Sequence, residues 1–234
     1  DMWMFVGTGI ISVTLFSYCY FTTVINVEAG IAASLLYTSP VFVMLFSAVL
    51  FRERITAQKI AAIVLTVSGV ALVSGMLGSS ALGALDLIIG IGAGLFYSLY
   101  SIFGVYALRK YSSLTVTFYT FLLGTIGFLF MTNPIAIIEK TASNPVVIPM
   151  EIGLALFNGL LPYLFYTIGL GHTDASVAGV LVAVEPLVGC LVGIFVFHES
   201  VNPAKLIGIA LILSAIVLLN IRLSHKSTAK EIPA

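Results

Sequence analysis

The chain reads YTSPVFVMLFSAVLFRERITAQK over residues 37–59 and AVEPLVGCLVGIFVFHESVNPAK over residues 183–205. Three pairs of residues align between these stretches without a gap, each 146 positions apart: Pro40 with Pro186, Glu53 with Glu199, and Lys59 with Lys205. At the same offset Tyr20 aligns with Tyr166. Matches of leucine and alanine are frequent between apolar sequences, so the evidence rests on these rarer residues. The alignment predicts an internal repeat.

The composition of the chain indicates a membrane protein. Of its 234 residues, 60% are hydrophobic and 9% are Asp, Glu, Lys or Arg, whereas a soluble domain carries about 25% charged residues. Ten basic and ten acidic residues give a net charge of zero, which argues against a nucleic-acid partner. The two cysteines lie far apart in apolar stretches and form no metal-ligand spacing. We expect an all-α integral membrane protein with the lipid bilayer as a partner, without metal or cofactor.

Eight stretches are long and apolar enough to cross a bilayer, which takes about 20 residues as a helix. They cover residues 3–24, 27–51, 57–77, 86–107, 113–132, 150–170, 174–197 and 203–222. If the chain alternates sides, eight Lys and Arg residues lie on one side: Arg52, Arg54, Lys59, Arg109, Lys110, Arg222, Lys226 and Lys230. Lys140 and Lys205 lie on the other side. The side with the basic excess, and with it the C-terminus, is expected to be cytoplasmic.

The offset moves the match from the second apolar stretch to the seventh, and an odd shift inverts one copy relative to the other. The sequence therefore predicts an inverted-topology repeat, in which two equivalent halves open a central site to each face in turn. The second copy has five helices and the first has three, so eight helices out of ten are expected here. We assign residues 1–77 to the last three helices of the first repeat and 78–85 to a linker. Residues 86–222 form the complete second repeat, and 223–234 a cytoplasmic tail.

These residues resemble a known family. The stretch 29–72, with Tyr37-Thr38-Ser39-Pro40-Val41-Phe42 and Phe51-Arg52-Glu53-Arg54, is similar to the end of an EamA domain of the drug/metabolite transporter superfamily. The stretch 175–218, with Glu185-Pro186-Leu187 and Phe197-His198-Glu199, resembles the same motif in a second domain. The resemblance implies ten helices in two inverted repeats and cytoplasmic termini. It also implies export or exchange of small metabolites such as amino acids, or of drugs, in the manner of a bacterial inner (cell) membrane transporter.

Glu185 is the outstanding candidate for a transport residue. It lies about 12 residues from either end of its apolar stretch, and a rise of 1.5 Å per residue puts it near the bilayer midplane. A charged side chain there costs about 2.5 to 3.5 kcal/mol on insertion scales. We therefore expect Glu185 to face a cavity or a partner, where it binds a substrate amine, takes part in proton coupling, or fixes helix packing beside Pro186. The first repeat has Ser39 at the equivalent position.

Other residues are candidates for the lining of a cavity or for bends in the helices. Pro40, Pro162 and Pro186 each remove a backbone donor and should break or bend their helices, and Pro40 and Pro186 leave the carbonyls of Leu36 and Val182 without helical partners. Asn158, Pro162 and Tyr166 share one face of their helix. The corresponding face of the repeat mate, residues 3–24, carries Ser12, Phe16 and Tyr20. The remaining candidates for the cavity are Tyr163, Tyr97, Tyr37 and Ser39. Glu53 and Glu199, at helix ends, are assigned gating or structural roles.

One helix face is composed of small residues. Gly90, Gly94, Ser98 and Ser101 follow one side of the stretch 86–107, and small residues let membrane helices approach closely. We expect a close helix contact there.

The predicted function is a secondary transporter that works by alternating access on a small-molecule substrate, as an exporter. A substrate-selective channel or facilitator is the first alternative, because pores also use glutamates and carbonyls. An intramembrane enzyme is a weaker alternative, because the sequence has no G-x-S-x-G or H-E-x-x-H motif. Substrate identity, coupling ion, direction of transport and oligomeric state stay open.

Overall fold

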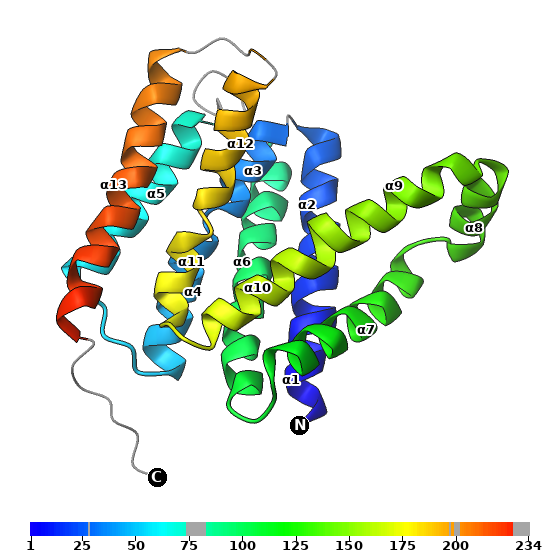
Figure 1. Cartoon of the computed structure of the whole chain (residues 1–234), viewed down its shortest axis with the longest axis horizontal. Helices are drawn as coiled ribbons and strands as arrows, with labels where there is room; N and C mark the ends of the chain where they lie inside the picture. Colours follow the sequence, from blue (N-terminus) through cyan, green and yellow to red (C-terminus); the bar gives the residue numbers. More distant parts are fainter. Residues whose placement is uncertain (28, 74–82, 197, 199–201, 227–234) are drawn as a thin grey trace.

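The computed structural model describes residues 1–27, 29–73, 83–196, 198 and 202–226. Glu199, residues 78–82 of the expected linker and residues 227–234 of the expected tail lie outside the described residues. The described part folds into helices joined by short connections (Figure 1). In chain order these are α1 (Met2–Val6), η1 (Gly7–Thr14), α2 (Leu15–Asn26), α3 (Ala29–Leu36), α4 (Ser39–Leu50), α5 (Ala57–Val73), α6 (Ala84–Leu108), α7 (Ser113–Met131), α8 (Pro134–Ser143), η3 (Pro145–Val147), α9 (Ile148–Gly153), η4 (Leu154–Leu160), α10 (Leu161–Leu170), α11 (Ala175–Leu181), α12 (Val184–Phe195) and α13 (Pro203–Lys226).

Six helical stretches are long and apolar enough to cross a membrane. They are Met2–Asn26, Ile31–Leu50, Ala84–Leu108, Ser113–Met131, Pro145–Leu170 and Ala175–Val192. Two shorter apolar helices, Ala57–Val73 and Pro203–Leu218, fall at the positions of the other two expected spans. The structure therefore confirms a helical architecture with several membrane-spanning candidates.

Two of the spans are broken in the middle. Tyr37 and Thr38 form a turn between α3 and α4, and Val182 and Ala183 form a turn between α11 and α12. Pro40 and Pro186 each occupy an early position of the helix that follows the turn. Proline is tolerated at the first turn of a helix because the N–H that it lacks would have no helical partner there. Each break therefore comes a few residues before its proline.

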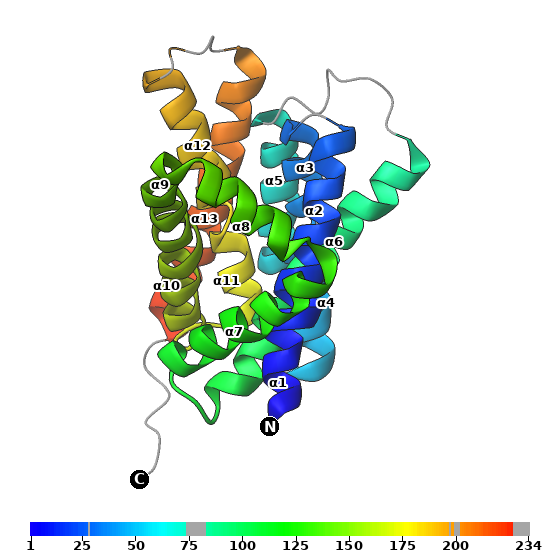
Figure 2. The same cartoon turned by 90° about the vertical axis from the view of Figure 1, so that its right-hand side faces the viewer.

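The same local irregularities occur in both halves of the chain. A π-helical segment covers residues 7–14 in the first half and residues 154–160 in the second. The two non-glycine residues with positive φ in the described chain, Arg52 (55°) and His198 (54°), are 146 positions apart. In both views α3 and α4 run downward while α11 and α12 run upward (Figures 1 and 2).

The helices α5 and α13 pack against each other at two glycines (Figure 1). A Cβ on Gly69 would lie 2.8 Å from the carbonyl oxygen of Gly208, and a Cβ on Gly208 would lie 2.6 Å from that of Gly69. Ala62 and Ala215, both fully buried, continue the contact in one apolar cluster with residues of α11. The absence of side chains at the two glycines lets the backbones touch.

An arm of helices projects from the bundle. The helices α7, α9 and α10 lean outward, and α8 connects them at the far end (Figures 1 and 2). None of the most apolar window of Pro145–Leu170 is buried, whereas half of the corresponding window of Met2–Asn26 is. The short helix α8 was not expected from the sequence. It begins at Pro134, and the side chain of Asn133 caps it by accepting a hydrogen bond from the N–H of Ala136 at 3.2 Å.

We predict that Gly69→Ala destabilises the protein by about 1 to 3 kcal/mol, because the added Cβ forces two backbones apart. Gly169→Ala is the matched control, since nothing lies within 4 Å of a Cβ at that position. Thermal unfolding in detergent, followed by circular dichroism, measures both. Equal melting temperatures for the two variants would show that the α5–α13 crossing does not depend on this contact.

Candidate functional site

Glu185 lies in the first turn of α12 and interacts with tyrosines from four other spans. Tyr37, 5% exposed at the break between α3 and α4, packs in one apolar cluster with Ala183 and Leu187 on either side of Glu185. Its phenol interacts electrostatically with the Glu185 carboxyl group. The carboxyl group also interacts electrostatically with Tyr20, Tyr97 and Tyr163. We refer to Glu185, Tyr20, Tyr37, Tyr97 and Tyr163 as the Glu185 cluster.

Aromatic contacts hold the tyrosines of this cluster in place. The ring of Phe16 lies 5.7 Å from that of Tyr20 and 5.1 Å from that of Tyr97, which joins α2 to α6. The ring of Tyr163 lies 5.0 Å from that of Tyr100 and 5.3 Å from that of Phe121. Such tilted and edge-on pairs are favourable beyond the area they bury. Glu185 itself is exposed, so the cluster brings an accessible carboxyl group together with fixed aromatic rings.

A ladder of hydroxyl groups supports the tyrosines on α10. The hydroxyl of Tyr100 lies 2.5 Å from that of Thr167, which donates to the carbonyl of Tyr163 at 2.6 Å. The hydroxyls of Tyr166 and Ser101 are 2.7 Å apart. Hydrogen bonds between side chains of neighbouring membrane helices help to fix the relative position of those helices. Tyr166 is therefore tied to α6 rather than placed directly against Glu185.

The other candidates for the cavity are distributed differently. Ser12 and Ser39 are buried, at 1% and 3% exposure. Asn158 and Pro162 are exposed on the arm, although Tyr166 faces α6. The π-helical turn at 154–160 explains the divergence, because its wider turns change the angular relation between residues four apart. The structure thus brings Tyr20, Tyr37, Tyr97 and Tyr163 to Glu185, and it does not bring Asn158 there.

The expected free carbonyl at Val182 is not found. The N–H of Glu185 donates to the carbonyl oxygen of Val182 at 2.9 Å. The break is a tight turn that satisfies this group locally, so the prediction that Pro186 leaves it without a partner is wrong.

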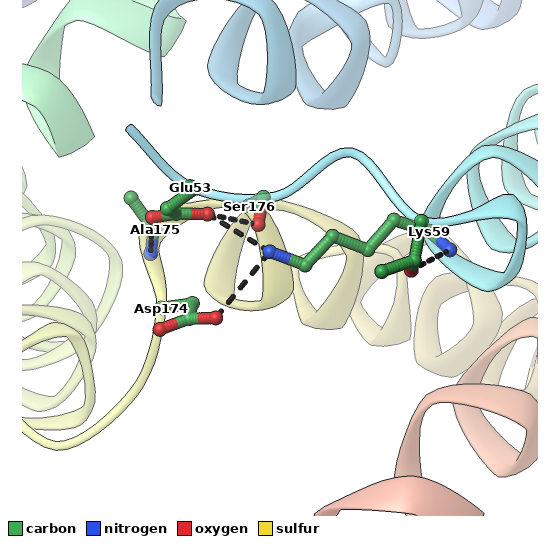
Figure 3. A network of polar contacts seen from close by, with 6 residues as sticks. Glu53, Lys59, Asp174, Ala175 and Ser176 are labelled. Atoms are coloured by element: carbon green, nitrogen blue, oxygen red, sulfur yellow. Dashed lines mark hydrogen bonds and ion pairs between the residues drawn. The ribbon is translucent and has the colours of Figure 1, made fainter. Parts of the chain in front are cut away.

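A second polar group joins the two halves at the end of the bundle where α4 finishes (Figure 3). The Glu53 carboxylate accepts hydrogen bonds from the backbone N–H of Ala175, at 3.2 Å, and from the hydroxyl of Ser176. The ammonium group of Lys59 lies 3.0 Å from Glu53 and 3.3 Å from Asp174. A carboxylate at the N-terminus of a helix satisfies free N–H groups and interacts favourably with the helix dipole. We call Glu53, Lys59, Asp174 and Ser176 the Glu53 network.

The small-residue face of α6 makes the close contact that the sequence predicted. A Cβ on Gly90 would lie 2.3 Å from Leu35, and one on Gly94 would lie 2.5 Å from the hydroxyl of Thr38. The expectation of close helix packing is therefore confirmed for these two glycines. This contact holds α6 against the broken span.

A groove of about 230 Å³ lies between α10 and α11 and is lined mainly by apolar side chains, Tyr166 and Leu181 among them. It does not include Glu185. In the described part of the chain, no group of three or more His, Cys, Asp or Glu residues could hold a metal ion.

Sequence reasoning missed several members of these arrangements. Asp174 and Ser176 flank the start of α11, which marks them as capping residues. Lys59 entered only through the repeat and the distribution of basic residues. Tyr100 looked like an ordinary aromatic residue in an apolar helix, and its contacts depend on how α6 and α10 pack.

The chain is similar to known proteins in sequence and in fold. The model of the EamA-like transporter family matches residues 1–75 and 85–221. A solved crystal structure with 17% sequence identity covers 94% of this chain and 78% of its own, with a TM-score of 0.74. At that identity the match concerns the fold alone.

Three similar relatives have names that describe transport. An uncharacterized transporter of Archaeoglobus fulgidus is 30% identical over 85% of this chain and 70% of its own length. A probable terminal-alkyne amino-acid exporter of Streptantibioticus cattleyicolor is 29% identical over 85% of this chain and 66% of its own. The threonine/homoserine exporter RhtA of Escherichia coli K12 is 24% identical over 92% of this chain and 70% of its own.

We predict that Lys59→Met loosens the start of α11, because it leaves Glu53 and Asp174 without their common cation. Lys59 is 13% exposed, and removing it should destabilise the protein by about 1 to 3 kcal/mol. Lys110→Met is the matched control, because the Lys110–Asp1 pair is 57% and 37% exposed and such pairs contribute about 0 to 1 kcal/mol. Hydrogen–deuterium exchange over residues 175–181 measures the effect. Faster exchange in both variants alike would contradict a specific role for Lys59.

Proposed function

The chain belongs to the EamA-like transporter family, and on that premise we propose that it is a secondary transporter that exports small metabolites, amino acids, related compounds or drugs, by alternating access. The observation that carries the proposal is the Glu185 cluster. An accessible carboxyl group at the centre of a membrane span carries a free-energy cost, which a role in binding a substrate or a coupling ion would account for. Tyrosines from α2, the turn after α3, α6 and α10 interact with it electrostatically.

An inverted repeat is the basis of the proposed mechanism. Three kinds of local feature support it, since the helix breaks, the π-helical segments and the positive-φ residues each occur once in either half. The opposite directions of the two broken spans in Figures 1 and 2 also support it. Two halves with the same construction and opposite orientation can exchange conformations, so that a central site opens to one face and then to the other.

The proposed membrane topology has eight spans in this chain and a cytoplasmic C-terminus. Arg52, Arg54, Arg109 and Lys110 lie in the connections after α4 and α6, and those two connections are at the same end of the bundle (Figure 1). The excess of basic residues favours a cytoplasmic location for this end.

The Glu53 network is proposed as the closure of the cytoplasmic end. It joins the loop after α4 in the first half to the start of α11 in the second half through four polar contacts. The side chains of Lys59 and Glu53 are only 13% and 14% exposed. Opening toward the cytoplasm would require these contacts to separate. Glu199 is proposed for the equivalent role at the other end from its place in the repeat.

Glu185 is proposed to bind the substrate, and proton coupling through the same carboxyl group is compatible with that role. A group that binds a cation or a proton in turn can link the two movements. Its repeat mate Ser39 is neutral, so the charge belongs to one half.

We predict saturable flux by the reconstituted protein in a screen of amino acids and cationic drugs, with accelerated exchange when substrate is present on both sides. Glu185→Gln should lower this flux at least about tenfold, because a charged partner of the substrate is lost. Glu151→Gln is the control, since Glu151 is exposed and contacts Thr141 at 3.2 Å. Flux that neither saturates nor shows competition would indicate a channel, and equal flux in both variants would remove Glu185 from the mechanism.

The topology predicts that positions 109 and 144 lie on opposite sides of the membrane. Single cysteines there, in a background without Cys19 and Cys190, should differ in labelling by an impermeant maleimide added to intact cells. Asn144→Cys should react and Arg109→Cys should react only after the cells are opened. Equal labelling of both from outside would refute the assignment.

A further inference from the structure

Arg109 lies over two aromatic rings at the end of the bundle where α1 begins and α4 and α6 finish (Figure 1). Its guanidinium carbon is 5.5 Å from the centre of the Phe51 ring and 5.2 Å from that of the Tyr106 ring. The two rings are 5.1 Å apart, so they join the end of α4 to the last turn of α6. A guanidinium group on an aromatic face keeps the N–H donors at its edge available. The exposed side chain of Arg109 is thus held in place with donors that a ligand can reach.

The carboxylates at this end of the bundle bind other groups. The Asp1 carboxylate lies 2.9 Å from the ammonium group of Lys110. The Glu53 carboxylate lies 3.0 Å from that of Lys59. Among the described residues, the guanidinium group of Arg109 has neither an ion-pair partner nor a hydrogen-bond acceptor. Its positive charge is therefore not neutralised by this part of the protein.

Two aromatic residues indicate how deep this site lies in the membrane. The ring of Trp3, in α1, lies 5.4 Å from that of Tyr106 and 6.1 Å from that of Phe103. Trp3 is 50% exposed on the outside of the bundle. Tryptophan and tyrosine are enriched where the headgroups of a bilayer meet its hydrocarbon core. Arg109, which stacks on Tyr106, is therefore at the level of the lipid phosphates.

The positive charge at this end favours an anionic lipid over a zwitterionic one. Arg52 and Arg54, in the connection after α4, are exposed and form no ion pair with any described residue. The planar guanidinium group can donate two parallel hydrogen bonds to phosphate oxygens. Every phospholipid has such oxygens, but only an anionic lipid also brings the net negative charge that unpaired arginines attract.

We propose that Arg109, held by Phe51 and Tyr106 beside Trp3, binds the phosphate group of an anionic phospholipid in the leaflet at this end of the bundle. Arg52, next to Phe51 in the chain, adds to the attraction. The site is separate from the Glu185 cluster, and the inference does not depend on the transport function or on its substrate.

Trp3 reports on this site because it is the only tryptophan in the chain and its ring lies beside Tyr106. The full chain is reconstituted in vesicles of phosphatidylglycerol and phosphatidylcholine in equal amounts, and one lipid or the other carries bromine high on its acyl chain. Quenching of Trp3 fluorescence gives the relative association constant of the two lipids. We expect about a fivefold preference for phosphatidylglycerol. Arg109→Gln should make the two lipids equal quenchers.

Lys110→Met is the matched control, because it removes the same charge from a residue that is already paired with Asp1. It should retain the preference. Equal quenching by both lipids in the parent protein overturns the proposal. A preference that falls alike in Arg109→Gln and Lys110→Met shows a general attraction to the charged end and overturns the assignment to Arg109.

Inorganic phosphate and glycerol 3-phosphate distinguish a lipid from a free phosphate compound. Neither should alter the preference at millimolar concentration, and its loss on addition of either would overturn lipid as the ligand. Thermal unfolding in detergent checks that each variant is folded. If Arg109→Gln does not fold, Arg109→Lys takes its place, since it keeps the charge but loses the planar fork. An undiminished preference in that variant would contradict recognition by the guanidinium group.

Discussion

The structure depends on the burial of two helix breaks, where the regular backbone hydrogen bonds are interrupted. In hydrocarbon, backbone polar groups have no water to bind, so a broken helix is tolerated only where protein surrounds the break. Tyr37 and Ala183, one at each break, are buried with Val70 and Ile212 from α5 and α13. Those two helices cross with their backbones in contact at Gly69 and Gly208. The crossing thus brings both breaks together and sets Glu185, at the start of α12, beside Tyr37.

The Glu185 cluster and the Glu53 network have different roles in the proposed transport cycle. The Glu185 cluster lies at the middle of the bundle and is the candidate for substrate binding. The Glu53 network lies at one end and joins the halves through a helix N-terminus and an ion pair. A site at the centre and a separable closure at an end are the parts that alternating access requires. In this account the charge at Glu185 decides what is carried, and the Glu53 network decides which face is closed.

The sequence predicted the helices well and the site only in part. Apolar length and the repeat of Pro40 and Pro186 indicated broken spans, and Glu185 stood out because an acidic residue at mid-membrane is costly. The sequence also indicated four tyrosines that interact electrostatically with Glu185, namely Tyr20, Tyr37, Tyr97 and Tyr163. The position of Asn158 was missed because a π-helical segment cannot be deduced from a period of 3.6 residues. The partners of Glu53 depend on tertiary packing between the halves, which no local pattern specifies.

The central claim is that two oppositely oriented halves rock about the shared crossing. Double electron–electron resonance measures it through two pairs of spin labels, each with one label in either half. One pair replaces Arg54 and His172 at the end that carries the Glu53 network, and the other replaces Ile25 and Val196 at the opposite end, all of them exposed positions. On addition of a transported compound, the account predicts that one distance lengthens while the other shortens. Distances that change in the same direction, or do not change at either end, would contradict it.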